Sequence, residues 1–91
     1  MKNVLVRLQE YSAQATTTEK EVIAFLLKEP EQAAGCSIHE LAERTFSSTS
    51  TVIRLCQKTG FRGYKEFQQS LLYELAIRKD SVEKQMEEIR R

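Results

Sequence analysis

Two short helical patterns separated by a tight turn constrain this sequence more than any other feature. The first covers residues 38–44 and the second residues 49–59. Elsewhere apolar residues also recur at helical spacing, and no alternating strand pattern follows residue 60. Three Gly and one Pro in 91 residues leave few positions that break a helix. The sequence therefore predicts an all-α bundle of five to six helices without a β wing.

Cap signals define the ends of the two patterns. Ser37 and Glu40 form a capping box ahead of the first helix, and Ser48 is placed to cap the second. Residues 46–47 form the turn, and Gly60 supplies a left-handed residue where the second helix ends. Two short helices joined in this way are typical of a helix-turn-helix unit.

The second helix has two chemically different sides. One side is a stripe at helical spacing that consists of Val52, Leu55, Cys56 and Thr59. The side that points away consists of Ser50, Arg54 and Gln57. The helix also begins with a run of hydroxyl residues, which are mediocre helix formers. Such short polar side chains favour a partner that approaches this face closely.

Positive charge is concentrated in one segment. Residues 44–65 carry five cations and no acid, a net charge of +5, whereas residues 1–43 carry −3 and residues 66–91 carry −1. The whole chain is only +1, so one face is basic and the protein is not generally cationic. A basic segment around a polar helix face predicts sequence-specific binding of double-stranded DNA.

General helix-turn-helix geometry assigns roles to individual residues, because the start of the second helix enters the major groove. The residues expected at base edges are Thr49, Ser50 and Arg54, of which Arg54 can pair bidentately with guanine. The residues expected at phosphates are Ser48, Thr51, Lys58, Arg62 and Lys65. Ile53 either meets a thymine methyl or packs against the neighbouring helix.

The rest of the chain is expected to support this unit. Helices are predicted over residues 3–14, over 19–28 behind a Thr18/Glu21 capping box, and from Tyr64 onward, with residues 31–36 as a loop. Asp80 and Glu83 are placed to cap one more turn. Val82, Met86 and Ile89 form a thin stripe that fits a frayed end, a dimer contact or a linker. The best dimer surfaces outside the motif are this stripe and the stripe of Val4, Leu8 and Tyr11.

Composition excludes several classes. No Ser/His/Asp set, carboxylate pair or Gly-rich phosphate loop indicates an enzyme. Cys36, Cys56 and His39 are too few for a metal site, and no cofactor is expected. No apolar run is long enough for a membrane span or a signal peptide, so a cytoplasmic location is expected.

The region also resembles a known family in the identity and order of its residues. The matching residues are Glu40-Leu41-Ala42, Ser48, Thr51-Val52-Ile53-Arg54, Lys58 and Gly60-Phe61-Arg62-Gly63-Tyr64. Together they resemble the N-terminal helix-turn-helix domain of RpiR regulators of sugar and sugar-phosphate metabolism. The sequence departs from that pattern at Phe46-Ser47 and at Leu55, and we expect Phe46 to fill the space that Leu55 and Ser47 leave.

The resemblance implies a bacterial transcription factor that binds operator DNA as a homodimer or higher oligomer. It also implies a separate C-terminal sugar-isomerase-type (SIS) domain that senses a phosphosugar effector. Residues 1–78 would then be the DNA-binding domain, and residues 79–91 a helical linker toward that absent domain. This chain alone is expected to ignore sugar phosphates.

A second reading stays open on the residues alone. The same helical face can dock an acidic partner protein in a protein–protein interaction module. That reading uses the cations but gives no reason for the cluster of short hydroxyl side chains.

Overall fold

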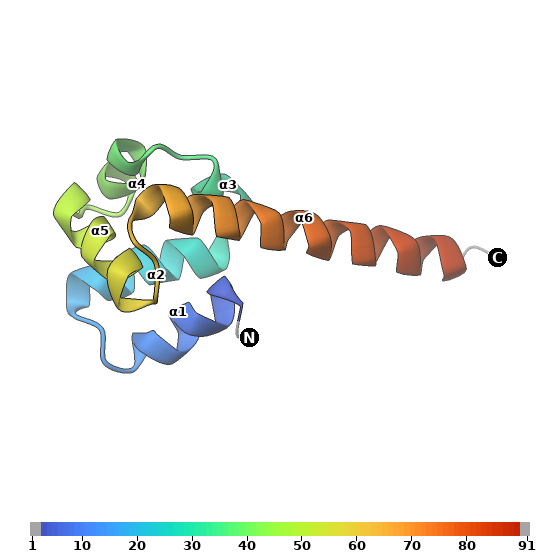
Figure 1. Ribbon diagram of the computed structural model, residues 1–91, viewed down its shortest axis with the longest axis horizontal. Coiled ribbons are helices and arrows are strands. Elements are labelled where there is room, and N and C mark those ends of the chain that lie inside the picture. The colour runs from blue at the N-terminus through green and yellow to red at the C-terminus, as the bar shows by residue number, and fades with distance from the viewer. Residues whose placement is uncertain (1–2, 90–91) are drawn as a thin grey trace.

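The computed structural model describes the backbone of residues 3–89 and the side chains of residues 3–78. In this part of the chain six α-helices and no strand are present, which confirms the all-α prediction. The helices are α1 (Val4–Ser12), α2 (Thr17–Lys28), α3 (Pro30–Ala34), α4 (Ile38–Arg44), α5 (Thr49–Lys58) and α6 (Tyr64–Ile89). Figure 1 shows α1 to α5 gathered around the first half of α6, whose second half extends away from the body.

One hydrophobic core joins all six helices. It is built from aliphatic side chains of every helix and from one aromatic ring, Phe67 of α6. Leu8, Leu41 and Leu71 have no exposed surface at all. Burying a side chain of this size stabilises the fold by about 1.5–3 kcal/mol. The inward stripe predicted for α5 belongs to this core, since Val52, Leu55, Cys56 and Thr59 are all buried.

The start of α2 differs from the prediction. The capping box is formed by Thr16 and Glu19, three residues apart, and not by Thr18 and Glu21. The Thr16 hydroxyl accepts from the Glu19 N–H at 3.2 Å, and Glu19 Oε1 accepts from the Thr16 N–H at 3.0 Å. Both pairs match the same local pattern. The box at Glu19 forms because Glu19 also receives a hydrogen bond from Tyr11 of another helix.

The segment predicted as a loop over residues 31–36 contains the short helix α3 instead. Pro30 stands at its first position, where the fixed φ of proline suits a helix and the missing N–H costs nothing. Its Ala33 and Ala34 side chains are buried in the core. The proline that was expected only to end α2 therefore also begins the next helix.

Side chains of α6 hold the loop between α3 and α4. The Tyr64 hydroxyl donates to the Cys36 carbonyl at 2.6 Å. The Gln68 amide donates to the carbonyls of Ala34 and Cys36, each at 2.9 Å. Burial raises the pKa of Tyr64 to about 12, so its hydroxyl keeps the proton that it donates. These bonds give partners to the carbonyl of Ala34, which the end of α3 leaves open, and to the carbonyl of Cys36 in the loop after it.

The first helix is shorter than predicted, and its apolar stripe has a different use. Val4 and Leu8 lie in the core, so the expected dimer surface at Val4, Leu8 and Tyr11 is wrong. The beginning of α1 is held by α6, because Glu74 accepts from the N–H groups of Val4 at 2.7 Å and of Leu5 at 3.3 Å. A carboxylate at a helix start satisfies open N–H groups and complements the helix dipole.

The last helix is continuous, without the separate turn that was expected at Asp80 and Glu83. The side chains of Val82, Met86 and Ile89 lie outside the residues whose side chains are described. The division at residue 78 between a domain and a linker therefore stays a prediction.

Glu74→Ala is expected to lower the free energy of unfolding by about 1–2 kcal/mol, because two N–H groups of α1 lose their acceptor. Urea denaturation at neutral pH measures this loss. Glu21→Ala, at an exposed position of α2, is the matched control and should change stability by less than about 0.5 kcal/mol. Equal effects of the two changes would contradict the capping role of Glu74.

Candidate nucleic-acid interface

Helices α4 and α5 form the helix-turn-helix unit with the predicted caps. The Ser37/Glu40 capping box caps the N-terminus of α4. Ser48 caps the N-terminus of α5. Its hydroxyl accepts from the Thr51 N–H at 3.1 Å and lies 3.0 Å from the Thr51 hydroxyl. The two hydroxyls predicted to meet phosphates are thus held next to each other at the start of α5.

The turn between the helices does not have the predicted packing. Phe46 was expected to fill space beside Leu55, but its side chain is 93% exposed, and Leu55 is fully packed without it. Phe46 adopts a positive φ of 54°. The residues on either side of Phe46 stabilise the turn. Thr45 Oγ1 donates to the Leu41 carbonyl at 2.8 Å and lies 2.9 Å from Ser47 Oγ. The turn is therefore stabilised by the hydroxyl pair of Thr45 and Ser47, and not by packing of the Phe46 ring as expected.

The outward side of α5 is available to a partner. Ser50, Arg54 and Gln57 are exposed, as predicted, and Thr49 and Thr51 are half-buried. Ser50 and Arg54 make no hydrogen bond or ion pair with another described side chain, so both can bind another molecule. The three residues assigned to base edges therefore lie in the first two turns of one helix, with Arg54 one turn after Ser50.

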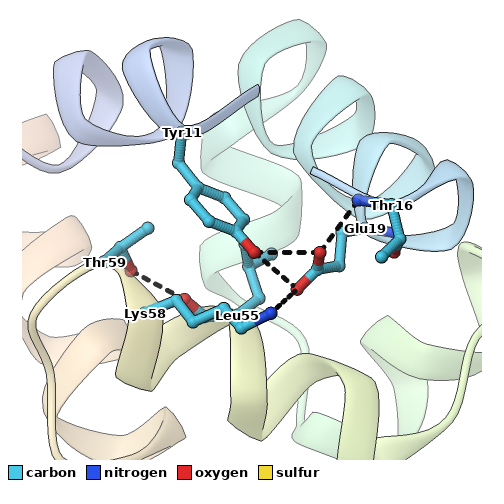
Figure 2. A network of polar contacts seen from close by, with 6 residues as sticks. All are labelled: Tyr11, Thr16, Glu19, Leu55, Lys58 and Thr59. Atoms are coloured by element: carbon cyan, nitrogen blue, oxygen red, sulfur yellow. Dashed lines mark hydrogen bonds and ion pairs between the residues drawn. The ribbon is translucent and has the colours of Figure 1, made fainter. Parts of the chain in front are cut away.

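Lys58 lies differently from the other predicted cations, because it turns toward α1 and α2 (Figure 2). Its Nζ is 3.7 Å from Glu19 Oε2 and 5.8 Å from the centre of the Tyr11 ring. The Lys58 side chain remains 45% exposed. An ammonium group has three N–H donors, so this pairing leaves Lys58 able to meet a phosphate as well.

Glu19 is the centre of this cluster. Its residue is only 3% exposed, and Tyr11 donates to both carboxylate oxygens at 3.0 and 3.1 Å. Burial alone raises the pKa of Glu19, but the hydrogen bonds from Thr16 and Tyr11 and the charge of Lys58 outweigh burial and bring the pKa below 4.5. The pKa of Lys58 is raised, chiefly by Tyr11 and also by Glu19. Both groups are therefore charged at neutral pH.

The C-terminal end of α5 is held by Arg7, a residue that was not predicted to have this role. Arg7 of α1 donates to the Thr59 carbonyl at 3.1 Å and lies 5.3 Å from the centre of the Phe61 ring. Gly60 has the predicted left-handed φ, at 100°, and a Cβ there would meet the Arg7 guanidinium at 2.8 Å. Arg7 is 52 residues from its acceptor. No local pattern in the sequence signals such a contact.

Two more predicted phosphate contacts lie beyond α5. Arg62 and Lys65 are both exposed, and Lys65 stands in the first turn of α6. The Arg62 backbone is fixed on both sides, since its carbonyl accepts from Gln57 at 3.4 Å and its N–H donates to Glu66 at 3.4 Å. The loop therefore presents Arg62 from a defined position.

Other kinds of site are not seen in the described part of the chain. No three His, Cys, Asp or Glu side chains there come together as metal ligands. Both cysteines are buried, and burial raises the pKa of Cys56 to about 12, which makes its thiol unreactive. Among the described helices none is both long and apolar enough to cross a membrane.

Comparison with known proteins agrees with this geometry. The family model for the helix-turn-helix domain of the rpiR family matches residues 2–78. The chain belongs to this family. An HTH-type transcriptional regulator of Haemophilus influenzae is 31% identical over 85 residues, which cover 93% of this chain and 30% of that protein. The regulator HexR of Pseudomonas aeruginosa is 36% identical over 76 residues, which cover 84% of this chain and 27% of HexR.

Solved structures give the same fold. The Vibrio vulnificus NanR protein complexed with ManNAc-6P has a TM-score of 0.78 and 31% identity, over 81% of this chain and 28% of that chain. The N-terminal domain of the transcriptional regulator ybbH of Bacillus subtilis has a TM-score of 0.73 and 22% identity, over 79% of this chain and 88% of that domain. The second likeness concerns the fold alone.

Membership of the rpiR family confirms that the chain is a DNA-binding domain of a transcriptional regulator and not an enzyme. The chain spans less than a third of the length of the full regulators that it matches.

The lowered pKa of Glu19 predicts a pH dependence of stability. A carboxyl group whose folded-state pKa lies below its ordinary 4.5 stabilises the fold above pH 4.5, and this contribution disappears as the pH falls through the lower folded-state value. Wild type should therefore exceed Glu19→Gln in stability at pH 7, and the difference should shrink below pH 4.5. Thermal denaturation of both proteins between pH 7 and 3 measures it. A difference that is constant with pH would contradict the charged state assigned to Glu19.

Proposed function

We propose that this chain recognises operator DNA for a bacterial transcriptional regulator, with α5 in the major groove. The observation that carries the proposal is the outward face of α5. It presents short hydroxyls and an unpaired Arg54 within a segment that has five cations and no acid. A groove-reading helix needs such short donors and acceptors next to its axis, together with a planar donor for guanine.

The side chains of the proposed DNA surface fall into two groups, those that contact base edges and those that contact phosphates. Thr49, Ser50 and Arg54 are proposed to contact base edges. Ser48, Thr51, Lys58, Arg62 and Lys65 are proposed to contact phosphates. Lys58 serves a phosphate with the donors that Glu19 leaves free, so its contribution is smaller than that of an unpaired lysine.

An acidic partner protein is the weaker reading of the same face. Protein interfaces place apolar and aromatic side chains at their centre. The outward side of α5 has hydroxyl, guanidinium and amide groups there, and its one exposed apolar side chain, Ile53, lies at the edge.

We further propose that the full regulator acts in the cytoplasm on sugar or sugar-phosphate metabolism. The support comes from the relatives, since NanR was solved with ManNAc-6P, a phosphosugar. Sensing is assigned to a part of the regulator beyond residue 91, and residues 1–91 alone are expected to bind DNA without responding to phosphosugars. Residues 79–91 then serve as the helical linker to that part.

Homodimerisation is proposed through the first half of α6. Tyr73 and Ile77 are exposed one turn apart on this helix, beside exposed Leu72. Tyr73 and Ile77, together with Val4 and Phe61, line an open groove of about 790 Å³ between α1 and α6. A two-fold dimer matches the symmetry of palindromic operators and raises the affinity of a small module.

Arg54→Ala and Lys58→Ala are expected to affect DNA binding differently. Arg54→Ala should cost about 1–3 kcal/mol on a duplex selected from random DNA, and much less on random duplex, because a base contact is lost. Lys58→Ala should weaken both duplexes equally and flatten the slope of log affinity against log salt by up to about 0.9. Electrophoretic mobility shifts at several salt concentrations measure both effects.

Lys28→Ala, a lysine of α2 outside the basic segment, is the matched control and should leave binding unchanged. Melting temperatures must accompany these data, because Lys58→Ala also removes the partner of Glu19. If Arg54→Ala weakens selected and random duplexes to the same extent, the assignment of Arg54 to a base is wrong.

Ile77→Asp is expected to weaken self-association about tenfold or more, because it places a charge in the proposed dimer contact. Sedimentation equilibrium in the micromolar range measures the change. Ala24→Asp, at an exposed position of α2, is the control and should behave like wild type. A wild-type chain that is monomeric at high micromolar concentration would refute this surface.

A further inference from the structure

Phe46 is the most exposed large hydrophobic residue in the described part of the chain. It is also the one described residue other than glycine with a positive φ. That backbone conformation strains any residue with a Cβ, and glycine adopts it freely. The phenyl ring buries almost nothing in return. Phenylalanine is therefore a poor choice for the fold at this position, and an explanation must come from a contact outside the fold.

The position of Phe46 is fixed although its side chain is not packed. The Phe46 N–H donates to the Glu43 carbonyl at 3.2 Å, and the Ser47 N–H donates to the Ala42 carbonyl at 2.8 Å. The hydroxyls of Thr45 and Ser47 join the two flanks at 2.9 Å. The turn thus holds an aromatic side chain out in solvent from a defined backbone.

The ring lies close to the proposed DNA surface. Phe46 stands two residues before Ser48, the cap of α5, so their Cα atoms are at most about 7 Å apart. A helix with side chains is about 10–12 Å wide and the major groove about 12 Å wide. When the start of α5 occupies the groove, the chain that leads into it runs along the groove wall.

We infer that Phe46 makes an apolar contact with duplex DNA next to the site of α5, a role that rests on the proposed function. DNA offers two apolar surfaces at a groove wall, the thymine methyl group and the deoxyribose ring, and phenylalanine is a known partner of the methyl group. A protein partner fits less well, because every other residue from Arg44 to Thr51 is polar and this segment adds no second apolar side chain to the ring.

The test uses Phe46→Gly, which removes the ring and relieves the strained backbone. We expect a melting temperature that does not fall, together with about a threefold to tenfold loss of affinity for a selected duplex. The slope of log affinity against log salt should not change, because no charge is lost. Phe46→Asn, which also tolerates positive φ, should behave in the same way, and Phe46→Leu, which keeps an apolar side chain, should bind within about twofold of wild type.

Replacing thymines of the duplex by deoxyuridine separates the two apolar surfaces. If Phe46 contacts a methyl group, deoxyuridine weakens wild type more than it weakens Phe46→Gly. If it contacts deoxyribose, Phe46→Gly weakens binding to both duplexes equally. Unchanged affinity of a folded Phe46→Gly overturns the inference and leaves the proposed function intact. A wild-type chain that binds no duplex at all overturns the proposed function, and the inference falls with it.

Discussion

The buried carboxylate of Glu19 ties α5 to α1 and α2, in addition to the packing of α5 in the core. A charged group in the interior is costly unless hydrogen bonds and an opposite charge compensate it. Here Thr16, the N-cap of α2, supplies a backbone N–H, Tyr11 of α1 a hydroxyl and Lys58 of α5 an ammonium group (Figure 2). The compensation is complete only when α1, α2 and α5 meet in this one arrangement. Glu19 therefore serves as the cap of one helix and as the anchor of another.

The helix α6 holds other parts of the domain, and it does so with polar groups as well as through the core. Tyr64 and Gln68 bind the loop before α4, and Glu74 binds the start of α1. Arg7 of α1 then binds the end of α5. The chain of contacts runs from α6 through α1 to the recognition helix, so α5 is fixed at its far end without using its outward face. That face stays free of these contacts, as the proposed binding of DNA requires.

Local signals in the sequence were sufficient for the helix-turn-helix unit. The Ser37/Glu40 box, the Ser48 cap, the left-handed Gly60 and the buried stripe of α5 all depend on residues within a few positions of each other. The predictions from sequence were wrong where contacts between residues far apart in the chain determine the structure. Two equivalent capping boxes were possible before α2, and Tyr11 favours the one at Glu19. The helix α3 forms where α6 can bind its carbonyls. Phe46 was expected to fill the space that Leu55 and Ser47 leave, but the turn has a positive φ, Leu55 is packed without it, and the ring lies outside.

The residues of the DNA face differ in how strongly the fold depends on them. Ser50 and Arg54 have no hydrogen bond or ion pair among the described side chains, so changes there are expected to cost little stability. Ser48 and Lys58 have a second duty, as the cap of α5 and as the partner of Glu19. The candidate base contacts are thus free of structural duties, while two of the candidate phosphate contacts also hold the recognition helix in place. A regulator built in this way can change the sequence that it reads without changing how its reading helix is held.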